Sequence, residues 1–440
     1  MTHRPNPELE AQNEQLRKAH PTLFGLLSEK GKAIHFPKKG FLEQGREAQG
    51  KKINATIGMA IEDDGSPMRL PSLANIIRLD PCSVFPYAPC LGIPELRKTW
   101  QTLIYEKNPS LKGVISLPVV TSGLTHALNL FAYLFVNPGD PVVMTDTVWE
   151  NYTFIFENAY GGETVPFQTF SKGRFGIDGL SARMTEISGK RIVLFNFPHN
   201  PTGYSLTGPE ADEIVEQIRR VAEAGHPVIA VMDDAYFGLV YEKGVMGESL
   251  FARLAHLHEN VLAVKIDGAT KEEYAWGFRI GFITYACRSI TPDVCSILED
   301  KTGGAVRGSI SSSSRIGQCL LLNAMKSQEY AREKQDKFTL LKTRFDRVKD
   351  TVTRNRERYA ECFTPLPFNS GYFMCLEVKD GLNTEAIRHI LLKEFNIGVI
   401  ALGNLIRIAY SSVREDDIPA LFESIFKACQ MQRTGRSQPK

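Results

Sequence analysis

The 440-residue sequence predicts an α/β protein of two domains, the larger built on a mainly parallel sheet covered by helices on both faces. Short apolar stretches recur between residues 118 and 286, and amphipathic helical segments lie between them. After Arg315 the pattern changes to a long charged helix followed by short strands, which predicts a smaller α+β domain. The chain is long enough for two hydrophobic cores.

The elements of the larger domain follow in order. After the N-terminal helix Pro7–His20 and the charged, turn-rich stretch Gly40–Lys52, a helix begins near Pro94 and Glu95, two residue types suited to a first helical turn. A second helix begins at Ser122, and a third covers Pro209–Ala224. The predicted strands or strand ends are Pro118–Thr121, Pro141–Thr145, Arg191–Phe197, Pro227–Met232, Val261–Ile266 and Ile280–Ala286.

The smaller domain is expected to combine a helical region at Ser327–Tyr359 with strands and two further helices. Its other predicted elements are Tyr372–Val378, Asn383–Phe395, Ile397–Leu402, Leu405–Tyr410 and Glu415–Cys429. We expect residues 1–66 to be an N-terminal segment that belongs to this smaller domain, residues 67–318 to form the large domain, and residues 319–440 to complete the small one.

Bulk composition excludes several classes of protein. A net charge of +2 demands neither nucleic acid nor a membrane surface as partner. The N-terminus lacks an apolar signal segment, and no apolar run is long enough to span a bilayer, so a cytoplasmic location is expected. The eight cysteines are scattered without a C-x-x-C pair, which favours free thiols over disulfides or a metal site.

The stretch around Lys271 carries the chemistry. It lies between two apolar strands, and Arg279 follows eight residues later, before Ile-Gly. A partly desolvated lysine has a lowered pKa and forms Schiff bases, while arginine offers a planar fork of donors to a phosphate. Together they fit a grip on pyridoxal phosphate. A surface loop with ordinary charges is the alternative interpretation.

Other strand ends add candidate residues. Ser122-Gly123-Leu124 opens a helix whose N-terminus favours a phosphate, although a plain N-cap also explains it. Asn200 lies in Asn-Pro-Thr-Gly, which is either a turn or an amide donor to a ring oxygen. Asp233 and Asp234 end a strand and point to opposite faces, so one of them can meet a pyridine nitrogen.

Three further side chains are candidates with ordinary structural alternatives. Tyr236 follows the aspartates and is able to reach a ring oxygen, unless it is a core tyrosine. Trp149 follows Pro141–Thr145, where an indole stacks on a ring or packs in the core. Arg407 lies inside an apolar strand, where its charge needs either a substrate carboxylate or an internal salt bridge.

Taken together, NPTG at Asn200–Gly203, D-x-A-Y at Asp233–Tyr236 and K-x7-R-x-G at Lys271–Gly281 resemble the aspartate aminotransferase family of fold-type-I, class I/II pyridoxal-phosphate enzymes. The resemblance runs from about Ile53 to Cys429. It implies a seven-stranded-type sheet and a homodimer with shared active sites. It also implies transfer of an amino group from an L-amino acid of the aspartate, glutamate or aromatic type to a 2-oxo acid, by a ping-pong mechanism.

The resemblance assigns a role to each candidate. Lys271 forms the Schiff base and moves the proton, Asp233 pairs with the pyridine nitrogen, and Asn200 and Tyr236 hold the ring oxygen. Arg279 and the Ser122–Leu124 turn bind the phosphate, and Trp149 stacks on the ring. Arg407 and Gly58 contact the substrate carboxylate, and Tyr87 reaches the neighbouring subunit's cofactor phosphate.

The sequence departs from the family at several positions. Gly268 replaces the usual phosphate-contacting serine, and Thr270 is expected to substitute for it only in part. Asp234, Glu272 and Glu273 make the surroundings of Lys271 unusually negative. Arg307 falls where some members carry an arginine for a side-chain carboxylate across the dimer; a solvated surface arginine is the alternative.

Two other functions share the same cofactor grip. A C–S lyase performing β- or γ-elimination uses the same electron sink, which does not decide which bond breaks. A non-catalytic pyridoxal-phosphate-binding regulator is the third hypothesis, although the roughly fifty residues before the fold are too few and too weakly patterned for a DNA-binding helix-turn-helix.

Overall fold

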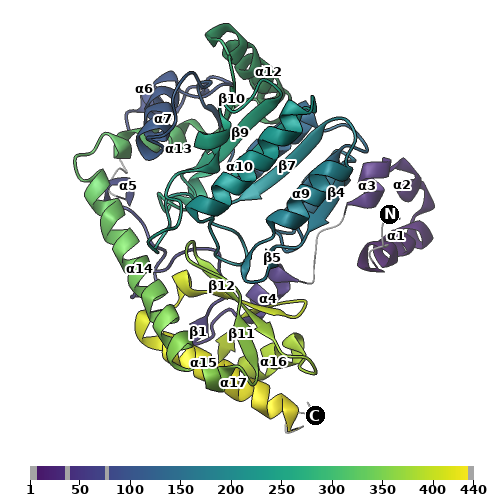
Figure 1. Ribbon diagram of the computed structural model, residues 1–440, viewed down its shortest axis with the longest axis vertical. Helices are drawn as coiled ribbons and strands as arrows, with labels where there is room; N and C mark the ends of the chain where they lie inside the picture. The colour runs from purple at the N-terminus through teal and green to yellow at the C-terminus, as the bar shows by residue number, and fades with distance from the viewer. Residues whose placement is uncertain (1–6, 35–39, 75–78, 435–440) are drawn as a thin grey trace.

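The computed structural model describes residues 7–34, 40–74 and 79–434, which are organised around a large and a small sheet (Figure 1). The large sheet has seven strands in the order β2-β10-β9-β8-β7-β3-β4. Strand β10 is antiparallel to both of its neighbours, and the other pairings are parallel. The strands are β2 (Val119–Thr121), β3 (Pro141–Thr145), β4 (Glu163–Phe167), β7 (Arg191–Asn196), β8 (Val228–Asp233), β9 (Val261–Gly268) and β10 (Gly281–Cys287). The predicted α/β class with a mainly parallel sheet is confirmed.

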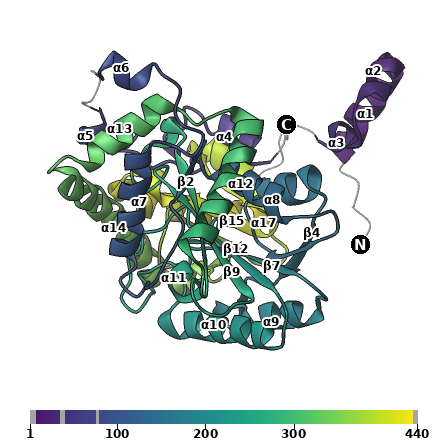
Figure 2. The ribbon, with the colours of Figure 1, turned by 90° about the horizontal axis from the view of Figure 1, so that it is seen from above.

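Helices cover both faces of this sheet (Figure 2). On one face lie α8 (Leu124–Phe135) and α12 (Pro292–Ile310), and on the other α9 (Ile177–Glu186), α10 (Gly208–Glu223) and α11 (Leu250–Leu254). Strand β8 shows how two cores arise. Ile229 and Val231 face the core beneath α8, whereas Val228, Ala230 and Met232 face the opposite core. This alternation decides which side of the sheet each residue at the strand end meets.

The small sheet is antiparallel, in the order β11-β12-β15-β14. Its strands are β11 (Phe363–Pro365), β12 (Phe373–Val378), β14 (Ile400–Leu402) and β15 (Leu405–Ala409). Around it lie α14 (Tyr330–Arg354), α16 (Thr384–Ile390), η3 (Leu391–Phe395) and α17 (Ile418–Arg433). Strand β1 (Ile53–Asn54) pairs in parallel with β13 (Ile397–Gly398), which brings the N-terminal segment to this C-terminal unit.

The remaining elements connect these layers or precede them. Helices α1 to α3, purple in Figures 1 and 2, form an arm that projects from the rest of the molecule, and α3 contacts η1 (Thr153–Ala159). The other helices are α1 (Pro7–Ala19), α2 (Pro21–Leu26), α3 (Glu29–Ala33), α5 (Pro71–Ala74), α6 (Pro81–Val84), α7 (Pro94–Lys107), α13 (Arg315–Met325) and α15 (Arg356–Tyr359). Short elements are β5 (Phe170–Ser171), β6 (Arg174–Phe175), η1 (Thr153–Ala159), η2 (Trp276–Phe278), η4 (Tyr410–Ser412) and η5 (Glu415–Asp417).

One predicted segment is wrong, and several elements were not predicted, among them β4, α9 and α12. The stretch Gly40–Lys52 contains α4 (Phe41–Glu47) instead of turns, because Gln44 is buried and exchanges hydrogen bonds of 3.0 and 2.7 Å with the backbone of Ala401. Strand β4 lies at the sheet edge and contains Pro166, which weakens a strand pattern. Helix α12 contains Gly303 and Gly304, which weaken a helix pattern.

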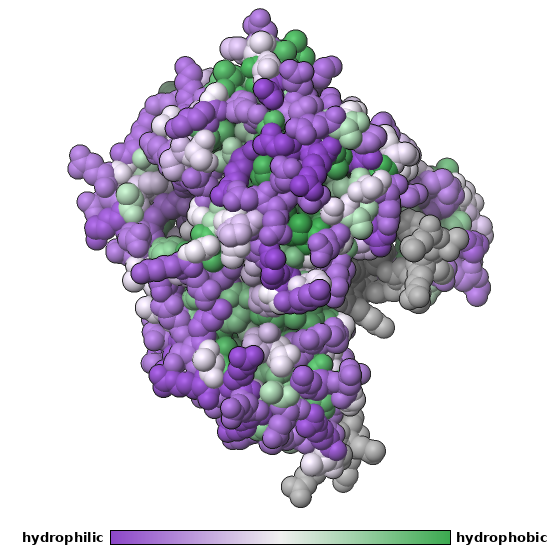
Figure 3. Space-filling view, viewed as in Figure 1, coloured by the Kyte–Doolittle hydropathy of each residue, from purple (hydrophilic) through white to green (hydrophobic). Residues whose placement is uncertain are grey.

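The surface is mostly hydrophilic on the face shown in Figure 3, with hydrophobic residues showing mainly between the elements. Within the described ranges, no helix is both long and apolar enough to cross a membrane. All eight cysteines lie in these ranges, and each is a free thiol.

Candidate functional site

The carboxyl ends of the parallel strands open onto a cavity of about 710 Å³ between the large and small sheets. Residues from both units line it, together with Phe41 and Leu42 of α4. Nine of the residues predicted for the site are among the lining residues: Gly58, Leu124, Trp149, Asn200, Asp233, Tyr236, Lys271, Arg279 and Arg407. Segments far apart in sequence therefore meet at one place.

Lys271 lies three residues beyond β9, and its side chain is half-buried in the cavity. Its Nζ lies 5.1 Å from the centroid of the Tyr236 ring, and its backbone carbonyl accepts a 2.9 Å hydrogen bond from Tyr372 Oη. Burial lowers the pKa of the Lys271 amine to about 8; Asp233 opposes this shift, and Arg279 adds to it. A substantial fraction of the amine is therefore neutral near pH 8, as a nucleophile requires.

Asp233 ends β8 on the side of the sheet that faces the cavity, and it is buried. Its Oδ2 accepts a 2.6 Å hydrogen bond from Tyr152 Oη. Burial raises the pKa of Asp233 to about 6, while Tyr152 and Lys271 pull it down. The carboxyl group is mainly ionised at neutral pH, the form needed to hold a protonated ring nitrogen. Tyr152 was missed in the sequence, where a lone aromatic after Trp149 gives no distinct signal.

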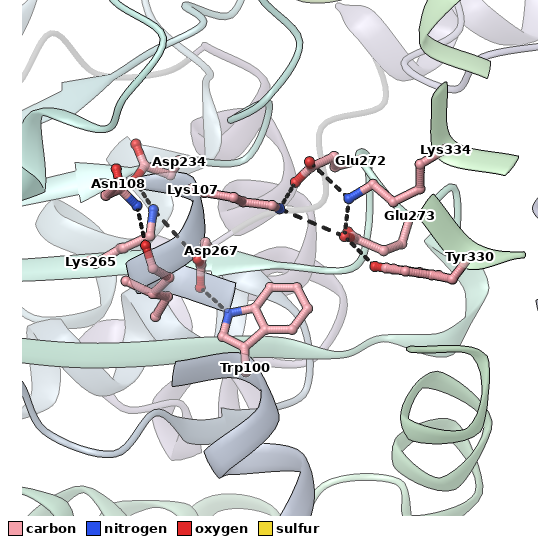
Figure 4. A network of polar contacts seen from close by, with 11 residues as sticks. Trp100, Lys107, Asn108, Asp234, Lys265, Asp267, Glu272, Glu273, Tyr330 and Lys334 are labelled. Carbon is pink, nitrogen blue, oxygen red and sulfur yellow. Dashed lines mark hydrogen bonds and ion pairs between the residues drawn. The ribbon is translucent and has the colours of Figure 1, made fainter. Parts of the chain in front are cut away.

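Asp234 points away from Asp233, as the strand alternation predicts. Its Oδ2 forms an ion pair with the fully buried Lys265 and accepts a 2.6 Å hydrogen bond from Ser249 Oγ. Lys265 is also 3.4 Å from Asp267, which accepts a 3.0 Å hydrogen bond from Trp100 Nε1 (Figure 4). The second aspartate is therefore a structural partner of Lys265.

Asn200 lies where the two units meet. Its backbone N–H donates 2.8 Å to Asn196 Oδ1, and Asn196 Nδ2 donates 2.8 Å to the carbonyl of Asp233, so the turn is fixed to the end of β8. Gly203, at φ +72°, approaches the small sheet so closely that a Cβ there would lie 1.8 Å from the carbonyl oxygen of Phe373. The glycine of the NPTG motif thus serves interdomain packing. Asn196 was not predicted.

Arg407 projects from β15 and is only 8% exposed. Its guanidinium donates 2.9 Å to the carbonyl of Thr56 and 3.4 Å to Asn200 Oδ1, and it lies over the rings of Phe41 and Phe373 at 4.9 and 4.5 Å. Among the residues that the structure describes, no carboxylate lies within ion-pair distance. Its Nε has no partner. The internal salt bridge considered from the sequence is absent there, which leaves the charge available to an anionic ligand.

Arg279 and the N-terminus of α8 lie against one another. Gly123, at φ +77°, is the N-cap of α8, and a Cβ there would lie 2.5 Å from Arg279 Nη2. Arg279 is exposed and has a left-handed backbone, with φ +55°. The first turn of a helix has backbone N–H groups without partners inside the helix. This pair of features offers a positive environment to an anion.

The departure at Gly268 has a steric cause. A Cβ there would lie 2.6 Å from the carbonyl oxygen of Ile280 and 2.7 Å from Gly281 Cα, so a serine does not fit without backbone movement. Nearby, the hydroxyl of Thr270 is buried, and this residue lines the cavity. Thr270 Oγ1 has no hydrogen-bond partner. An orphaned donor beside the cavity fits a ligand that bears acceptor oxygens.

Four predicted residues lie outside the lining of this cavity. Ser122 borders a second cavity, and its N–H donates to His126 Nδ1 at 3.1 Å, while Gly123 lies behind Arg279. Tyr87 is 90% exposed, and Arg307 is exposed in the last turn of α12. The roles given to all four by the resemblance stay predictions.

The donor set fits pyridoxal phosphate. Arg279, the first turn of α8 and the orphaned Thr270 hydroxyl suit a phosphate, Asp233 suits a pyridine nitrogen, and the Lys271 amine suits an aldehyde. In the described part of the chain, no cluster of three or more His, Cys, Asp or Glu side chains is placed to bind a metal.

Comparison with known proteins agrees with this geometry. The model of the family described as aminotransferase class I and II matches residues 65–425. The chain is 31% identical over 253 residues to the aspartate/prephenate aminotransferase of Thermus thermophilus, covering 56% of this chain and 58% of the relative. With the aromatic-amino-acid aminotransferase of Escherichia coli it shares 25% identity over 373 residues, covering 82% of this chain and 89% of the relative. It spans about half to two thirds of the length of most of the curated relatives.

Solved structures show the same fold. A crystal structure of an aminotransferase from Anaerococcus prevotii superposes with a TM-score of 0.80 at 24% identity, covering 92% of this chain and 99% of that one. These solved structures define the fold class of the chain, which is that of the aminotransferases. Within that class, the chain belongs to the aminotransferase class I and II family, whose members use pyridoxal 5′-phosphate.

The Tyr152 hydroxyl should control the protonation of Asp233. Tyr152→Phe removes a hydrogen bond that favours the ionised carboxylate, so the pKa of Asp233 should rise above its value of about 6. We expect a rise of roughly one unit, measured by carboxyl-carbon NMR titration of the cofactor-free protein. Tyr285→Phe, which removes a buried 2.8 Å contact with Thr302 outside the cavity lining, should leave this pKa unchanged. An unchanged pKa in Tyr152→Phe would contradict the assignment.

The close approach at Gly268 should exclude serine. Gly268→Ser should lower the free energy of unfolding by about 1–3 kcal/mol, because the new Cβ meets backbone atoms that have no room to move. Thermal unfolding of the cofactor-free protein measures this. Gly277→Ser is the control, since a Cβ at Gly277 meets nothing within 4 Å. Equal stability of the two variants would show that the backbone yields at Gly268.

Proposed function

We propose that the protein is an aminotransferase that moves the amino group of an L-amino acid to a 2-oxo acid by a ping-pong mechanism. One observation carries the proposal. A lysine amine with a pKa of about 8 shares a cavity with Asp233 and with an arginine, Arg407, that has no carboxylate partner among the described residues. This combination supplies a nucleophile and base, a group for a ring nitrogen, and a binding group for an α-carboxylate.

When bound, pyridoxal phosphate supplies an electron sink for the carbanion that forms at the substrate Cα. Asp233 would hold the ring nitrogen in its protonated form, because its carboxyl group is mainly ionised above pH 6. Asn200 and Tyr236 would hold the ring oxygen, and Trp149 would cover the ring. Arg279, Thr270 and the first turn of α8 would hold the phosphate.

Lys271 is the proposed acid and base. A pKa near the working pH lets one amine both accept and return a proton, which is the condition for efficient general acid–base catalysis. Its neutral form accepts the Cα proton of the amino acid and holds it on Nζ. The hydrogen bond from Tyr372 Oη to the carbonyl of Lys271 holds the backbone in place. The amine can therefore reach only one part of the cavity.

Arg407 would bind the α-carboxylate through its two terminal nitrogens. The rings of Phe41 and Phe373, which both lie against the guanidinium, exclude water and strengthen that ion pair. Phe41 belongs to α4, so the N-terminal segment takes part in enclosing the substrate. Gly58 lines the same part of the cavity as backbone without a side chain.

Substrate choice depends on the rest of the lining. Ile34, Phe41, Leu42 and Phe154 contribute apolar side chains to it, and Glu150 adds a carboxylate near Arg407. Burial raises the pKa of Glu150, and Arg407 lowers it. The similar proteins are named for aspartate/prephenate, tyrosine and aromatic amino acids. We propose an aromatic donor before an acidic one, since Glu150 repels a second carboxylate.

We also propose that the working unit is a homodimer in the cytoplasm. Tyr87 and Arg307 lie outside the cavity of their own subunit, and a second copy is the partner whose site they are proposed to complete. In that arrangement Tyr87 would contact the phosphate, and Arg307 would contact the side-chain carboxylate only when an acidic substrate is bound.

An absorbance spectrum tests the central proposal. Protein loaded with pyridoxal phosphate should show a visible band that gives way to a near-ultraviolet band when an amino donor is added without an acceptor. Lys271→Ala should lose the visible band and lower turnover by at least about a thousandfold, because the acid and base is removed. Near-normal turnover in Lys271→Ala would defeat the assignment, and release of pyruvate and ammonia from cysteine would favour a C–S lyase instead.

The charge of Glu150 should affect acidic substrates most. Glu150→Gln should raise kcat/KM for aspartate relative to phenylalanine by about three- to tenfold, because repulsion of the second carboxylate is removed. Initial rates with both donors measure this ratio, and Glu163→Gln on the exposed edge strand is the charge-matched control. A ratio that stays the same would show that Glu150 does not face the side chain of the substrate.

A further inference from the structure

The two residues that follow Lys271 are glutamates, and lysines from two separate helices hold them. Glu272 forms ion pairs with Lys107 of α7 and with Lys334 of α14, the latter at 2.9 Å (Figure 4). Glu273 is fully buried and lies 2.9 Å from Lys334 Nζ and 4.0 Å from Lys107 Nζ. It also accepts a 3.1 Å hydrogen bond from Tyr330 Oη at the start of α14.

This cluster accounts for the excess of negative charge around Lys271. Two carboxylates face two ammonium groups, so the cluster is neutral as a whole. Burial by itself raises the pKa of Glu272, but Lys107 and Lys334 lower it to about 2, and both glutamates raise the pKa of Lys334. Glu272 and Lys334 therefore stay charged across the neutral range. Gly238 makes room for the cluster, since a Cβ there would lie 2.5 Å from Glu272 Oε1.

The loop that follows needs external support. It connects Lys271 to Arg279, and two of its non-glycine residues, Tyr274 and Arg279, have left-handed backbone at φ +55°. Such conformations cost roughly 1–3 kcal/mol each and persist only where surrounding contacts impose them. Glu272 and Glu273 stand at the start of this loop, directly after the lysine, and their ion pairs are contacts of that kind.

Helix α14 extends the support to the small unit. It begins beside Glu273 and runs along α17 and η4 (Figure 1). Further along it, the fully buried Arg344 donates 2.5 Å to the carbonyl of Ser411 and forms a 2.9 Å ion pair with Asp63. Lys271 belongs to the large unit and Arg407 to the small one, so a rigid connection between the units sets the distance between these two groups.

We propose that Glu272 and Glu273 are positioning residues that, through Lys107 and Lys334, lock the loop bearing Lys271 to α7 and α14 and so hold its amine in register with Arg407. This inference rests on the proposed function for the purpose of the lock, but the lock itself is a property of the protein without cofactor. It assigns a role to four charged side chains, none of which lines the main cavity.

The experiment compares three variants of α14. Lys334→Met removes the shared cation, Lys334→Arg keeps it, and Lys337→Met removes a lysine of the same helix that forms a 2.6 Å ion pair with Glu62 at similar exposure (20% and 19%, against 16% and 16%). If Lys334→Met does not fold, Glu273→Gln combined with Lys334→Met replaces it. Amide hydrogen exchange of residues 269–281 in cofactor-free protein and the rate of visible-band formation after adding pyridoxal phosphate are measured.

Lys334→Met should exchange these amides about tenfold faster and form the visible band about tenfold more slowly, because a loop freed from its ion pairs opens locally. Lys334→Arg and Lys337→Met should stay within about twofold of the parent protein for both measurements. Unchanged exchange in Lys334→Met, or equal acceleration in Lys337→Met, would overturn the lock. Faster exchange with an unchanged rate of band formation would overturn the positioning role. A parent protein without a visible band would contradict the proposed function, while exchange alone would still decide the lock.

Discussion

The structure depends on how buried charges are neutralised at the carboxyl edge of the parallel sheet. A charge taken out of water is costly unless it is paired. Lys265, fully buried, is paired with Asp234 and Asp267, and all three lie on the side of the sheet away from the cavity. On the cavity side, Lys271 and Arg407 have no carboxylate within ion-pair distance in the described ranges. Charges paired within the protein thus lie apart from those left for a ligand, and the alternation of side chains at the end of β8 sends Asp234 to the first group and Asp233 to the cavity.

Much of this arrangement was predictable because buried parallel strands are read as continuous apolar runs. The strand ends at Thr145, Asn196 and Asp233 lie within one residue or two of their predicted positions, so the candidate residues that follow them were brought to one edge. Side chains whose role comes only from tertiary contacts were not predictable. Tyr152 is an ordinary aromatic in the sequence until its hydroxyl is found on Asp233, and α4 forms because Gln44 finds the backbone of Ala401.

The part of the cavity proposed to bind the phosphate, beside Arg279 and the N-terminus of α8, is shaped mainly by close contacts between backbone segments. Strand β10 pairs with both β9 and β2, which brings Gly281 beside Gly268 and Thr121. A Cβ at Gly281 would lie 2.7 Å from the carbonyl carbon of Gly123. Glycine at these crossings therefore lets the N-terminus of α8 approach the end of β9, and this crowding is what leaves no room for a serine hydroxyl at Gly268. The glycines at positions 268 and 281 are thus explained by the backbone packing around them.

The ion-pair cluster beside Lys271 is better explained by geometry than by stability. Replacing a buried ion pair with apolar residues is often neutral or stabilising, because desolvation offsets most of the electrostatic attraction. A cluster of Glu272, Glu273, Lys107 and Lys334 therefore adds little net free energy of unfolding for its size. Its effect is to fix the conformation of the loop. The two lysines reach the glutamates from different helices, so one arrangement pairs all four charges. The loop between Lys271 and Arg279 contains residues with left-handed backbone, so its conformation depends on contacts of this kind. The unusual charges near Lys271 are then a consequence of holding that loop between two structural units.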